Sequence, residues 1–250
     1  RENTCMKWIA AAVAALAVAG LAAFGAYETY LWGWWRMNNP SLERFPVQGV
    51  DVSHHQGPID WQRVEADPLI SFAYLKATEG GDHRDRQFAQ NWAALKTTRI
   101  ARGAYHFFTF CRPGREQVEN LLSVMPLEPG TLPVAIDLEF GGNCNRRPTV
   151  EELATELEDF VSLLRDRDDR APVFYVTPEF FSAYMAGQEG AYPAHLLWLR
   201  NIYGEPAHDG CNGWTFWQYA GQGLIDGITG PVDLNAYCGD GQAFNALRKR

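Results

Sequence analysis

Hydrophobic positions along the chain fall into short runs that alternate with segments of helical periodicity. The eight runs that predict strands are 47–52, 71–76, 103–108, 133–138, 172–176, 196–199, 215–219 and 232–237. Helical segments fit after each of the first five runs. The clearest covers 149–164, where Thr149 and Glu152 can form a capping box and an apolar stripe consists of Leu153, Leu157, Phe160 and Leu164.

Alternation of strands with helices is typical of a parallel α/β barrel. The stretches between the last three runs are short and rich in Gly and Pro. Because parallel neighbours need a crossover of about a dozen residues or more, we expect these late strands to pair antiparallel. The predicted fold is therefore an α/β, TIM-like barrel of eight strands whose helical ring is incomplete.

Residues 1–36 differ in kind from the rest of the chain. Segment 8–26 is apolar, uncharged and long enough to cross a bilayer as a helix, and Trp32, Trp34 and Trp35 match an aromatic belt at a membrane interface. The segment is a membrane anchor or a signal segment, and its length favours an uncleaved anchor with Lys7 on the cytoplasmic side. Residues 37–46 are expected to form a linker to a globular domain, 47–250. Both alternatives predict an extracytoplasmic location, either membrane-anchored or secreted.

The formal net charge of −8 argues against nucleic acid as a partner, because nucleic acid binding needs a basic face. The globular part contains Cys111, Cys144, Cys211 and Cys238, which an exported domain would tend to oxidise. We expect the pairs Cys111–Cys144 and Cys211–Cys238, with a free buried thiol as the alternative. A zinc site is disfavoured because no two cysteines have Cys-x-x-Cys spacing.

The apolar run 132–140 ends in two carboxylates. Val134, Ile136 and Leu138 predict a buried strand, so Asp137 and Glu139 point the same way at its exit. Burying two carboxylates side by side is costly unless their chemistry is used. Paired acids, one protonated and one ionised, are what cleavage of a glycosidic bond requires, whereas a strand leading into an acidic loop is the structural alternative.

Polar and aromatic side chains occur at the same end of nearly every predicted strand. In α/β barrels, catalytic groups lie where strands exit into the following loops. The residues at these exits are Asp51, Lys76, Tyr105, His106, Asp137, Glu139, Tyr175, Trp217, Gln218, Asp233 and Asn235. A merely solvated edge would not select acids and aromatic rings so consistently, so the pattern predicts one cleft.

These motifs together resemble the glycoside hydrolase family 25 lysozymes. The similar segments are 49–57 (Gly-Val-Asp-Val-Ser-His-His-Gln-Gly), 59–61, 72–80, 103–107, 132–139, 214–219 and 233–235, in chain order. The resemblance runs from about 47 to 237 and implies a modified (β/α)5(β)3 barrel. It also implies an N-acetylmuramidase that hydrolyses the β-1,4 bond between N-acetylmuramic acid and N-acetylglucosamine in peptidoglycan with retention. The anchor, the linker and the cysteines lie outside the family's core pattern.

Catalytic roles follow from this resemblance together with the chemistry of the acids. Glu139 is expected to be the general acid, with a raised pKa. Asp137 is expected to stay ionised, either as nucleophile or to orient the substrate's N-acetyl group. Asp51 and Asp233 resemble the remaining cleft acids of the family, which tune the pair or position substrate.

The other strand-end residues are expected to bind the sugar chain. Tyr105, Tyr175 and Trp217 offer flat faces for stacking on sugars, although each could equally be a core aromatic. The remaining candidates are Lys76, His106, Gln218 and Asn235. Lys76 could instead form a structural ion pair with Glu79 at the barrel rim.

Two other classes of function compete with the muramidase. One is a metal-dependent hydrolase that uses His54, His55 and His106, but adjacent histidines on a strand would face opposite ways. The other is a non-catalytic module that binds the cell wall. The favoured prediction needs no cofactor and no metal, and takes a peptidoglycan strand as partner of a monomeric catalytic domain.

Overall fold

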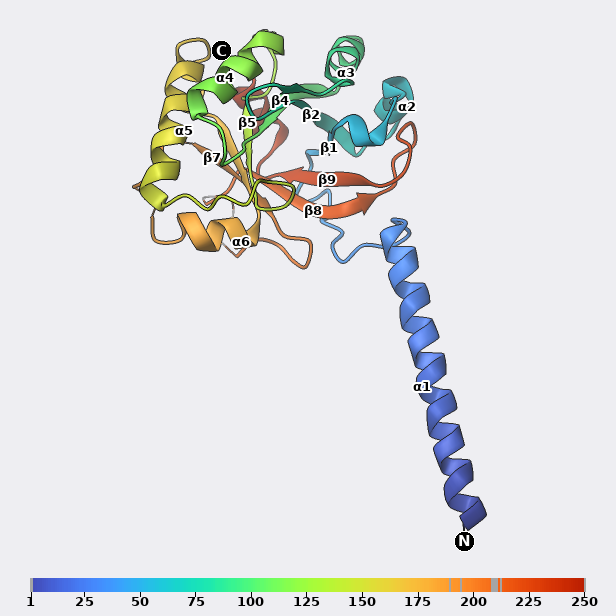
Figure 1. The fold of residues 1–250 in the computed structure, drawn as a ribbon. Coiled ribbons are helices and arrows are strands. Elements are labelled where there is room, and N and C mark those ends of the chain that lie inside the picture. Colours follow the sequence, from blue (N-terminus) through green and yellow to red (C-terminus); the bar gives the residue numbers. More distant parts are fainter. Residues whose placement is uncertain (1, 189, 194, 208–210, 212, 250) are drawn as a thin grey trace.

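A computed structural model of the chain describes residues 2–188, 190–193, 195–207, 211 and 213–249. It consists of a barrel from which one long helix, α1 (Glu2–Leu31), projects (Figure 1). The strands are β1 (Gln48–Val52), β2 (Ile70–Glu79), β3 (His83–Arg84), β4 (Ala101–Phe107), β5 (Ala135–Leu138), β6 (Val173–Val176), β7 (Leu196–Arg200), β8 (Phe216–Gly223) and β9 (Val232–Tyr237). All eight predicted strands are confirmed, and the short β3 is an addition that pairs with the end of β2.

The strand order is β1-β9-β8-β7-β6-β5-β4-β2, and pairing of β1 with β2 closes the barrel. Strand β9 runs antiparallel to both β8 and β1, as expected for the end of the chain. The expectation of antiparallel pairing was wrong for β7 and β8, which are parallel. The link between them, 201–215, is long enough to return the chain to the start of the barrel.

Helices follow the strands that the periodicity indicated. They are α2 (Trp61–Ala66), α3 (Phe88–Leu95), α4 (Gly114–Val124), α5 (Val150–Arg165) and α6 (Pro178–Phe180), the last extended by a π-helical turn, Phe181–Met185. The capping box at the start of α5 is confirmed: the Thr149 side chain accepts from the Glu152 amide, and the Glu152 carboxylate accepts from the Thr149 amide. Helix α7 (Gly241–Leu247), at the end of the chain, was not predicted.

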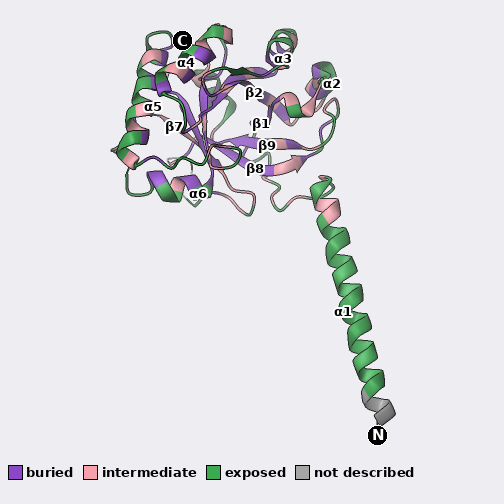
Figure 2. Ribbon diagram, viewed as in Figure 1, coloured by how far each residue is buried: buried purple, intermediate pink, exposed green. Residues whose placement is uncertain are grey.

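Strand alternation divides the core into two layers, both buried in Figure 2. Outward-facing side chains such as Ile136 and Leu138 pack under the helices. Inward-facing aromatic rings fill the barrel itself, and this inner set includes Phe72, Tyr74, Tyr175, Trp198 and Phe216. The barrel is therefore a packed core and not a pore, and space for a ligand remains only at one end.

Helix α7 closes the opposite end of the barrel. The Phe244 ring lies 5.6 Å from the ring of Phe72 and 5.2 Å from that of Tyr237, measured between centroids. Those two residues lie near the start of β2 and the end of antiparallel β9, at the floor of the barrel. Burial of Phe244 thus seals the inner core from water.

Both predicted disulfides are present. Cys111–Cys144, with a Cα–Cα distance of 6.3 Å, joins the loops that follow β4 and β5. Cys211–Cys238, with a Cα–Cα distance of 5.3 Å, joins the link after β7 to the end of β9. The first bridge therefore restrains the loop that continues directly from the predicted catalytic acids.

Helix α1 projects away from the barrel, and its segment Met6–Leu31 is long and apolar enough to cross a membrane. The residues expected to form a linker lie against the barrel. The Asn38 side chain donates to the carbonyl of Tyr219 (3.1 Å), the Gln48 side chain donates to that of Pro40 (3.1 Å), and the Phe45 ring packs against Trp217. We call residues 33–46 the strap, because they fix the base of α1 to the barrel.

The Phe244 contact yields a stability prediction. Phe244→Ala should lower the free energy of unfolding by about 3–5 kcal/mol, because it opens a cavity in the inner core. Chemical denaturation of the full chain in detergent measures this change. Gln242→Ala, on the exposed face of the same helix, should change stability by less than about 0.5 kcal/mol. Equal effects of the two substitutions would contradict the role assigned to α7.

Candidate active site

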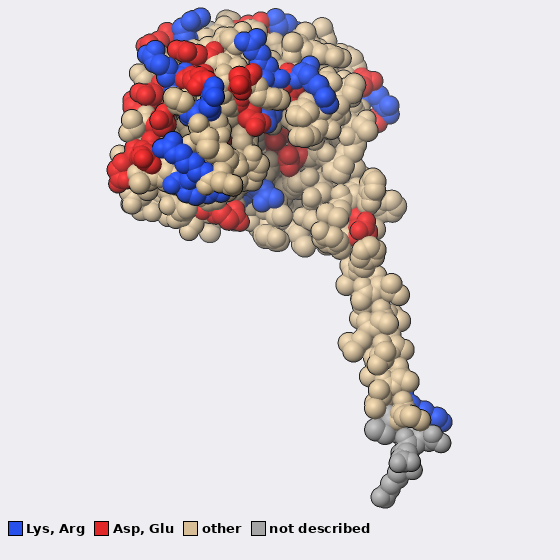
Figure 3. All heavy atoms as spheres, in the orientation of Figure 1, with Lys and Arg blue, Asp and Glu red and all other residues tan. Residues whose placement is uncertain are grey.

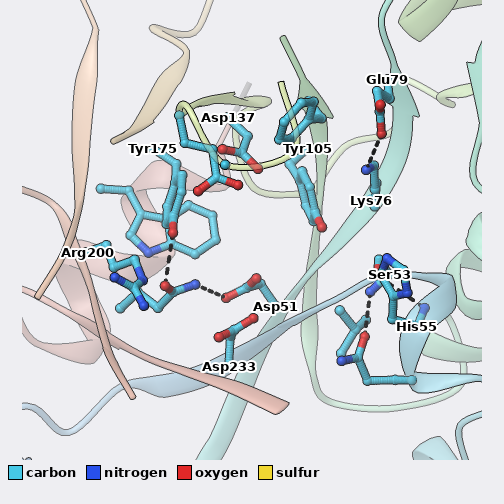
Figure 4. A pocket seen from close by; sticks show the side chains of 18 residues that line it. Asp51, Ser53, His55, Lys76, Glu79, Tyr105, Asp137, Tyr175, Arg200 and Asp233 are labelled. Atoms are coloured by element: carbon cyan, nitrogen blue, oxygen red, sulfur yellow. Dashed lines mark hydrogen bonds and ion pairs between the residues drawn. The ribbon is translucent and has the colours of Figure 1, made fainter. Parts of the chain in front are cut away.

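A cavity of about 490 Å³ lies at the carboxyl ends of the parallel strands. It appears as a hollow with acidic side chains in Figure 3, and its lining is drawn in Figure 4. Five carboxyl groups line it: Asp51, Asp137, Glu139 and Asp233, and also Glu79, which is paired with Lys76. The same cavity contains the side chains of Lys76 and Arg200 and the rings of Tyr105, Phe107, Tyr175 and Trp198. With Gln218 on β8, residues from eight strands thus meet around one space.

Asp137 and Glu139 share a face because of the pleat of β5. Ile136 and Leu138 point outward into the helix-covered core, so the two acids point into the cavity. Burial raises the pKa of Asp137 well above its ordinary value, and the charges of Glu139 and Asp51 raise it further. One carboxyl oxygen of Asp137, Oδ1, is buried without a hydrogen-bond partner among the described residues. These surroundings make ionisation of Asp137 more costly than it is in water.

Glu139 begins the loop after β5. Burial raises the pKa of its carboxyl group, while the charge of Arg200 acts in the opposite direction. The loop is held by Asn143, whose side chain donates to the carbonyls of Glu139 (3.0 Å) and Phe108 (2.8 Å). Together with the Cys111–Cys144 bridge, these contacts keep the acid at a fixed position beside the cavity.

Asp51 is held by a chain of hydrogen bonds across the barrel. Its Oδ2 accepts from the side-chain amides of Asn235 (2.7 Å) and Gln218 (3.0 Å). The oxygens of those amides accept in turn from Trp198 Nε1 (2.9 Å) and the Tyr175 hydroxyl (3.0 Å). Burial raises the pKa of Asp51, and its two donors partly offset that rise.

Asp233 faces Asp51 across the β1–β9 pair, where the two residues are in register. Its pKa is raised well above the ordinary value by burial and then by the charge of Asp51. Four buried carboxyl groups with raised pKa values cannot all ionise together at low cost, so the cavity retains protons to higher pH than exposed carboxyl groups would. That property is what an acid catalyst needs.

Tyr105, Tyr175 and Lys76 line the cavity as expected. Burial and the surrounding carboxylates raise the pKa of both tyrosines well above the ordinary value, so their hydroxyl groups remain protonated. The Lys76 ammonium forms an ion pair with Glu79 at 2.7 Å and lies 4.9 Å from the ring centroid of Phe107. The rim ion pair considered for Lys76 is therefore present, within the cavity wall itself.

Three predicted substrate contacts lie elsewhere. His106 and Trp217 occupy the outward faces of β4 and β8, because their neighbours Tyr105 and Gln218 point inward. His106 bonds to Thr78 (2.7 Å) and Gln117 (3.2 Å), and the Trp217 indole donates to the carbonyl of Asn201 (2.8 Å).

The third misplaced residue, Asn235, is fully buried below the cavity. Its side chain bonds to Asp51 and Trp198 and does not line the cavity, so it positions the acid. Expecting His106, Trp217 and Asn235 to touch substrate was therefore wrong.

The lining residues that the sequence analysis missed include Trp198 and Arg200, both on β7. Arg200 comes directly after the predicted strand 196–199, so the criterion of polar residues at strand exits would have identified it. Trp198 is buried in the inner core with its indole nitrogen bonded to Asn235. No local signal in the sequence distinguishes it from a purely structural tryptophan.

The histidines proposed as metal ligands do not converge. His54 and His55 begin a 3-10 turn, His54–Gln56, so their rings lie 4.1 Å apart and do not face opposite ways as a strand would require. His54 Nδ1 bonds to Asp85 (2.9 Å), whereas His106 is buried on the far side of the barrel wall, where burial lowers its pKa to about 4. Among the described residues, no group of three or more potential ligands could hold a metal ion.

Comparisons with known proteins agree with this geometry. The family model for glycosyl hydrolases family 25 matches residues 50–228. Lysozyme M1 of Streptomyces globisporus is 33% identical over 213 residues, which cover 80% of this chain and 71% of that protein. An uncharacterized Escherichia coli protein, YegX, is 31% identical over 81% of this chain and 74% of its own length.

Solved structures show the same fold. A family 25 glycosyl hydrolase from Bacillus anthracis matches with a TM-score of 0.75 at 33% identity, covering 84% of this chain and 96% of that one. A bacterial lysozyme from Streptomyces coelicolor matches with a TM-score of 0.73 at 31% identity, covering 81% and 96%. With the acidic cavity at the strand ends, these matches show that the chain belongs to the glycosyl hydrolases of family 25.

Proposed function

We propose that the chain is a peptidoglycan N-acetylmuramidase that hydrolyses the β-1,4 bond between N-acetylmuramic acid and N-acetylglucosamine. The observation that carries this proposal is the pair of acids at the end of β5, Asp137 and Glu139, set in a cavity with three further carboxyl groups. Family membership and the relatives named lysozyme support the choice of substrate.

In the proposed mechanism, Glu139 protonates the glycosidic oxygen. Its raised pKa keeps the proton on the carboxyl group to higher pH than usual for a glutamate. Asp137 supports the positive charge that develops at the anomeric carbon, as nucleophile or by accepting a hydrogen bond from the substrate's acetamido N–H. The unpartnered Oδ1 of Asp137 favours the second role, because a buried acceptor without a donor is costly until a ligand supplies one. Both routes retain the anomeric configuration.

Asp51 and Asp233 complete the proposed site. Asp51 is fixed by its two amide donors, so it offers a constant negative field next to the reacting centre. Tyr105 and Tyr175 present hydroxyl groups and flat faces to a sugar in the cavity.

We also propose that α1 is an uncleaved membrane anchor and that the barrel works on the extracytoplasmic side. The strap supports this, because a rigid connection to the barrel is what an anchor uses and what a removed leader does not need. The exposed indoles of Trp32 and Trp34, directly after the apolar span, suit a membrane interface. The proposed arrangement divides the chain into an anchor, 1–36, a connecting segment, 37–46, and a catalytic domain, 47–250.

The role of Glu139 has a direct test. Glu139→Gln should lower kcat on purified peptidoglycan by about 100-fold or more, since it removes the proton donor and keeps the shape. Mass spectrometry of borohydride-reduced fragments should find N-acetylmuramic acid at every new reducing end released by the unchanged chain. Glu158→Gln, at an exposed position of α5, is the matched control and should keep full activity. Binding of peptidoglycan without any release would instead indicate a non-catalytic wall-binding module.

The pH dependence of kcat/KM tests the electrostatics of the cavity. Because burial raises the pKa of Glu139, its proton is retained to higher pH than usual, and activity should fall only as the pH rises through that raised pKa. The alkaline midpoint is therefore expected above the ordinary glutamate value of about 4.3. Initial rates on soluble glycan fragments, taken from about pH 3 to pH 9, give this midpoint. A midpoint at or below the ordinary value would exclude Glu139 as the acid.

The anchor is tested by fractionation. The full chain should sediment with membranes and resist an alkaline wash. A double substitution, Leu16→Arg with Leu21→Arg, should release it, because each arginine at the centre of a span costs about 2.5–3.5 kcal/mol. Both leucines are exposed on α1, away from the barrel. Recovery of a soluble protein that begins near residue 26 would contradict the anchor.

A further inference from the structure

Arg200 is a cation in the cavity to which the proposed mechanism assigns no contact with the substrate. It ends β7 with its side chain toward the cavity, in register with Gln218 on β8 and near Asp233 in the close view (Figure 4). The two preceding inward residues of β7, Leu196 and Trp198, belong to the inner core, so the pleat fixes the direction of Arg200. The guanidinium is therefore presented to whatever fills the cavity.

The two cations of the cavity differ in how they are used. Lys76 is committed to Glu79, at 2.7 Å, and to the face of Phe107. The Arg200 guanidinium forms no hydrogen bond or ion pair with any residue that the structure describes, although carboxyl groups surround it. A planar group with five donors is thus left available, and its preferred partner is a carboxylate bound by two parallel hydrogen bonds.

The surroundings of Arg200 restrict the kind of ligand. Ionised carboxyl groups in the cavity disfavour an anionic ligand, so an anion binds best where a cation compensates. N-acetylmuramic acid differs from N-acetylglucosamine by a lactyl ether on the ring carbon next to the acetamido carbon. When Asp137 holds the acetamido group, the lactyl group on the neighbouring ring carbon lies in the same cavity, whose lining includes Arg200.

We propose that Arg200 binds the lactyl carboxylate of the N-acetylmuramic acid whose glycosidic bond is cleaved. This inference rests on the proposed muramidase function and adds a substrate preference to it. The carboxylate is free only where the stem peptide has been removed, because in peptide-bearing strands it is an amide and carries no charge. Arg200 therefore makes the enzyme favour peptide-free glycan strands over peptide-bearing strands and over N-acetylglucosamine polymers.

The test compares two substrates in the full chain in detergent. Peptide-free strands, prepared from peptidoglycan with an amidase, and peptide-bearing soluble fragments are digested by the unchanged chain, Arg200→Gln and Arg200→Lys. Arg200→Gln should raise KM for peptide-free strands about 10- to 100-fold, because these strands lose a charge-assisted pair with the guanidinium. The same substitution should change KM for peptide-bearing fragments less than about threefold, because these fragments have no such pair to lose. Arg200→Lys should restore part of the difference. Arg44→Gln, at an exposed ion pair with Glu205 outside the cavity, is the matched control.

Other outcomes overturn the inference. For Arg200→Gln, an equal loss of kcat on both substrates, with a shift in the alkaline midpoint of the pH profile, would show that Arg200 acts on the pKa values of the carboxyl groups and does not bind the lactyl carboxylate. Unchanged kinetics on both would leave the lactyl carboxylate bound by something else.

Binding separates this inference from the muramidase proposal. Calorimetry with peptide-free strands needs no turnover, and weaker binding to Arg200→Gln than to the unchanged chain supports the inference. Absence of N-acetylmuramic acid ends from the unchanged chain defeats the proposed function and, with it, this inference. Equal binding by the unchanged chain and Arg200→Gln, with those ends present, defeats the role of Arg200 alone.

Discussion

The structure depends on how the carboxyl group of Asp51 is held below the open end of the barrel. A buried carboxylate is expensive unless donors replace the water it loses. Those donors, Gln218 and Asn235, come from β8 and β9, and β9 pairs directly with β1. The antiparallel β9 therefore serves both as a wall of the barrel and as the strand that places a donor beside Asp51.

Asp51 and Asp137 show how the same residue type is prepared for two roles. The protein itself satisfies Asp51, whose Oδ2 accepts two short hydrogen bonds. It leaves Oδ1 of Asp137 buried without a donor. A buried acceptor without a donor costs free energy, and that cost is recovered when a bound substrate donates to it. The unpartnered Oδ1 of Asp137 is thus consistent with the proposed contact to the substrate's acetamido group.

Sequence reasoning succeeded where periodicity carries the information. The strands, the helix after β5 and the inward direction of Asp137 and Glu139 all follow from the alternation of buried positions. The prediction of cavity residues failed for His106 and Trp217, whose side chains point outward from the barrel. Both were chosen for their residue type, without asking which face of the strand they occupy. The parallel pairing of β7 and β8 was missed for a different reason: a crossover of loop alone has no periodic signal.

If α1 crosses a membrane as proposed, the strap fixes where the cavity lies relative to that membrane. A side chain at Gly33, which has a positive φ of 74°, would collide with the carbonyl oxygen of Gln222, near the end of β8. Since β8 runs parallel to β7, that end of β8 extends on the same side of the barrel as the cavity. With α1 across a bilayer, the cavity would lie close to the membrane surface. The distance from the membrane at which it meets glycan strands would be set by the size of the barrel and not by a flexible linker. Such an enzyme would act on glycan strands that pass next to the membrane, which suits local opening of the wall better than its general degradation.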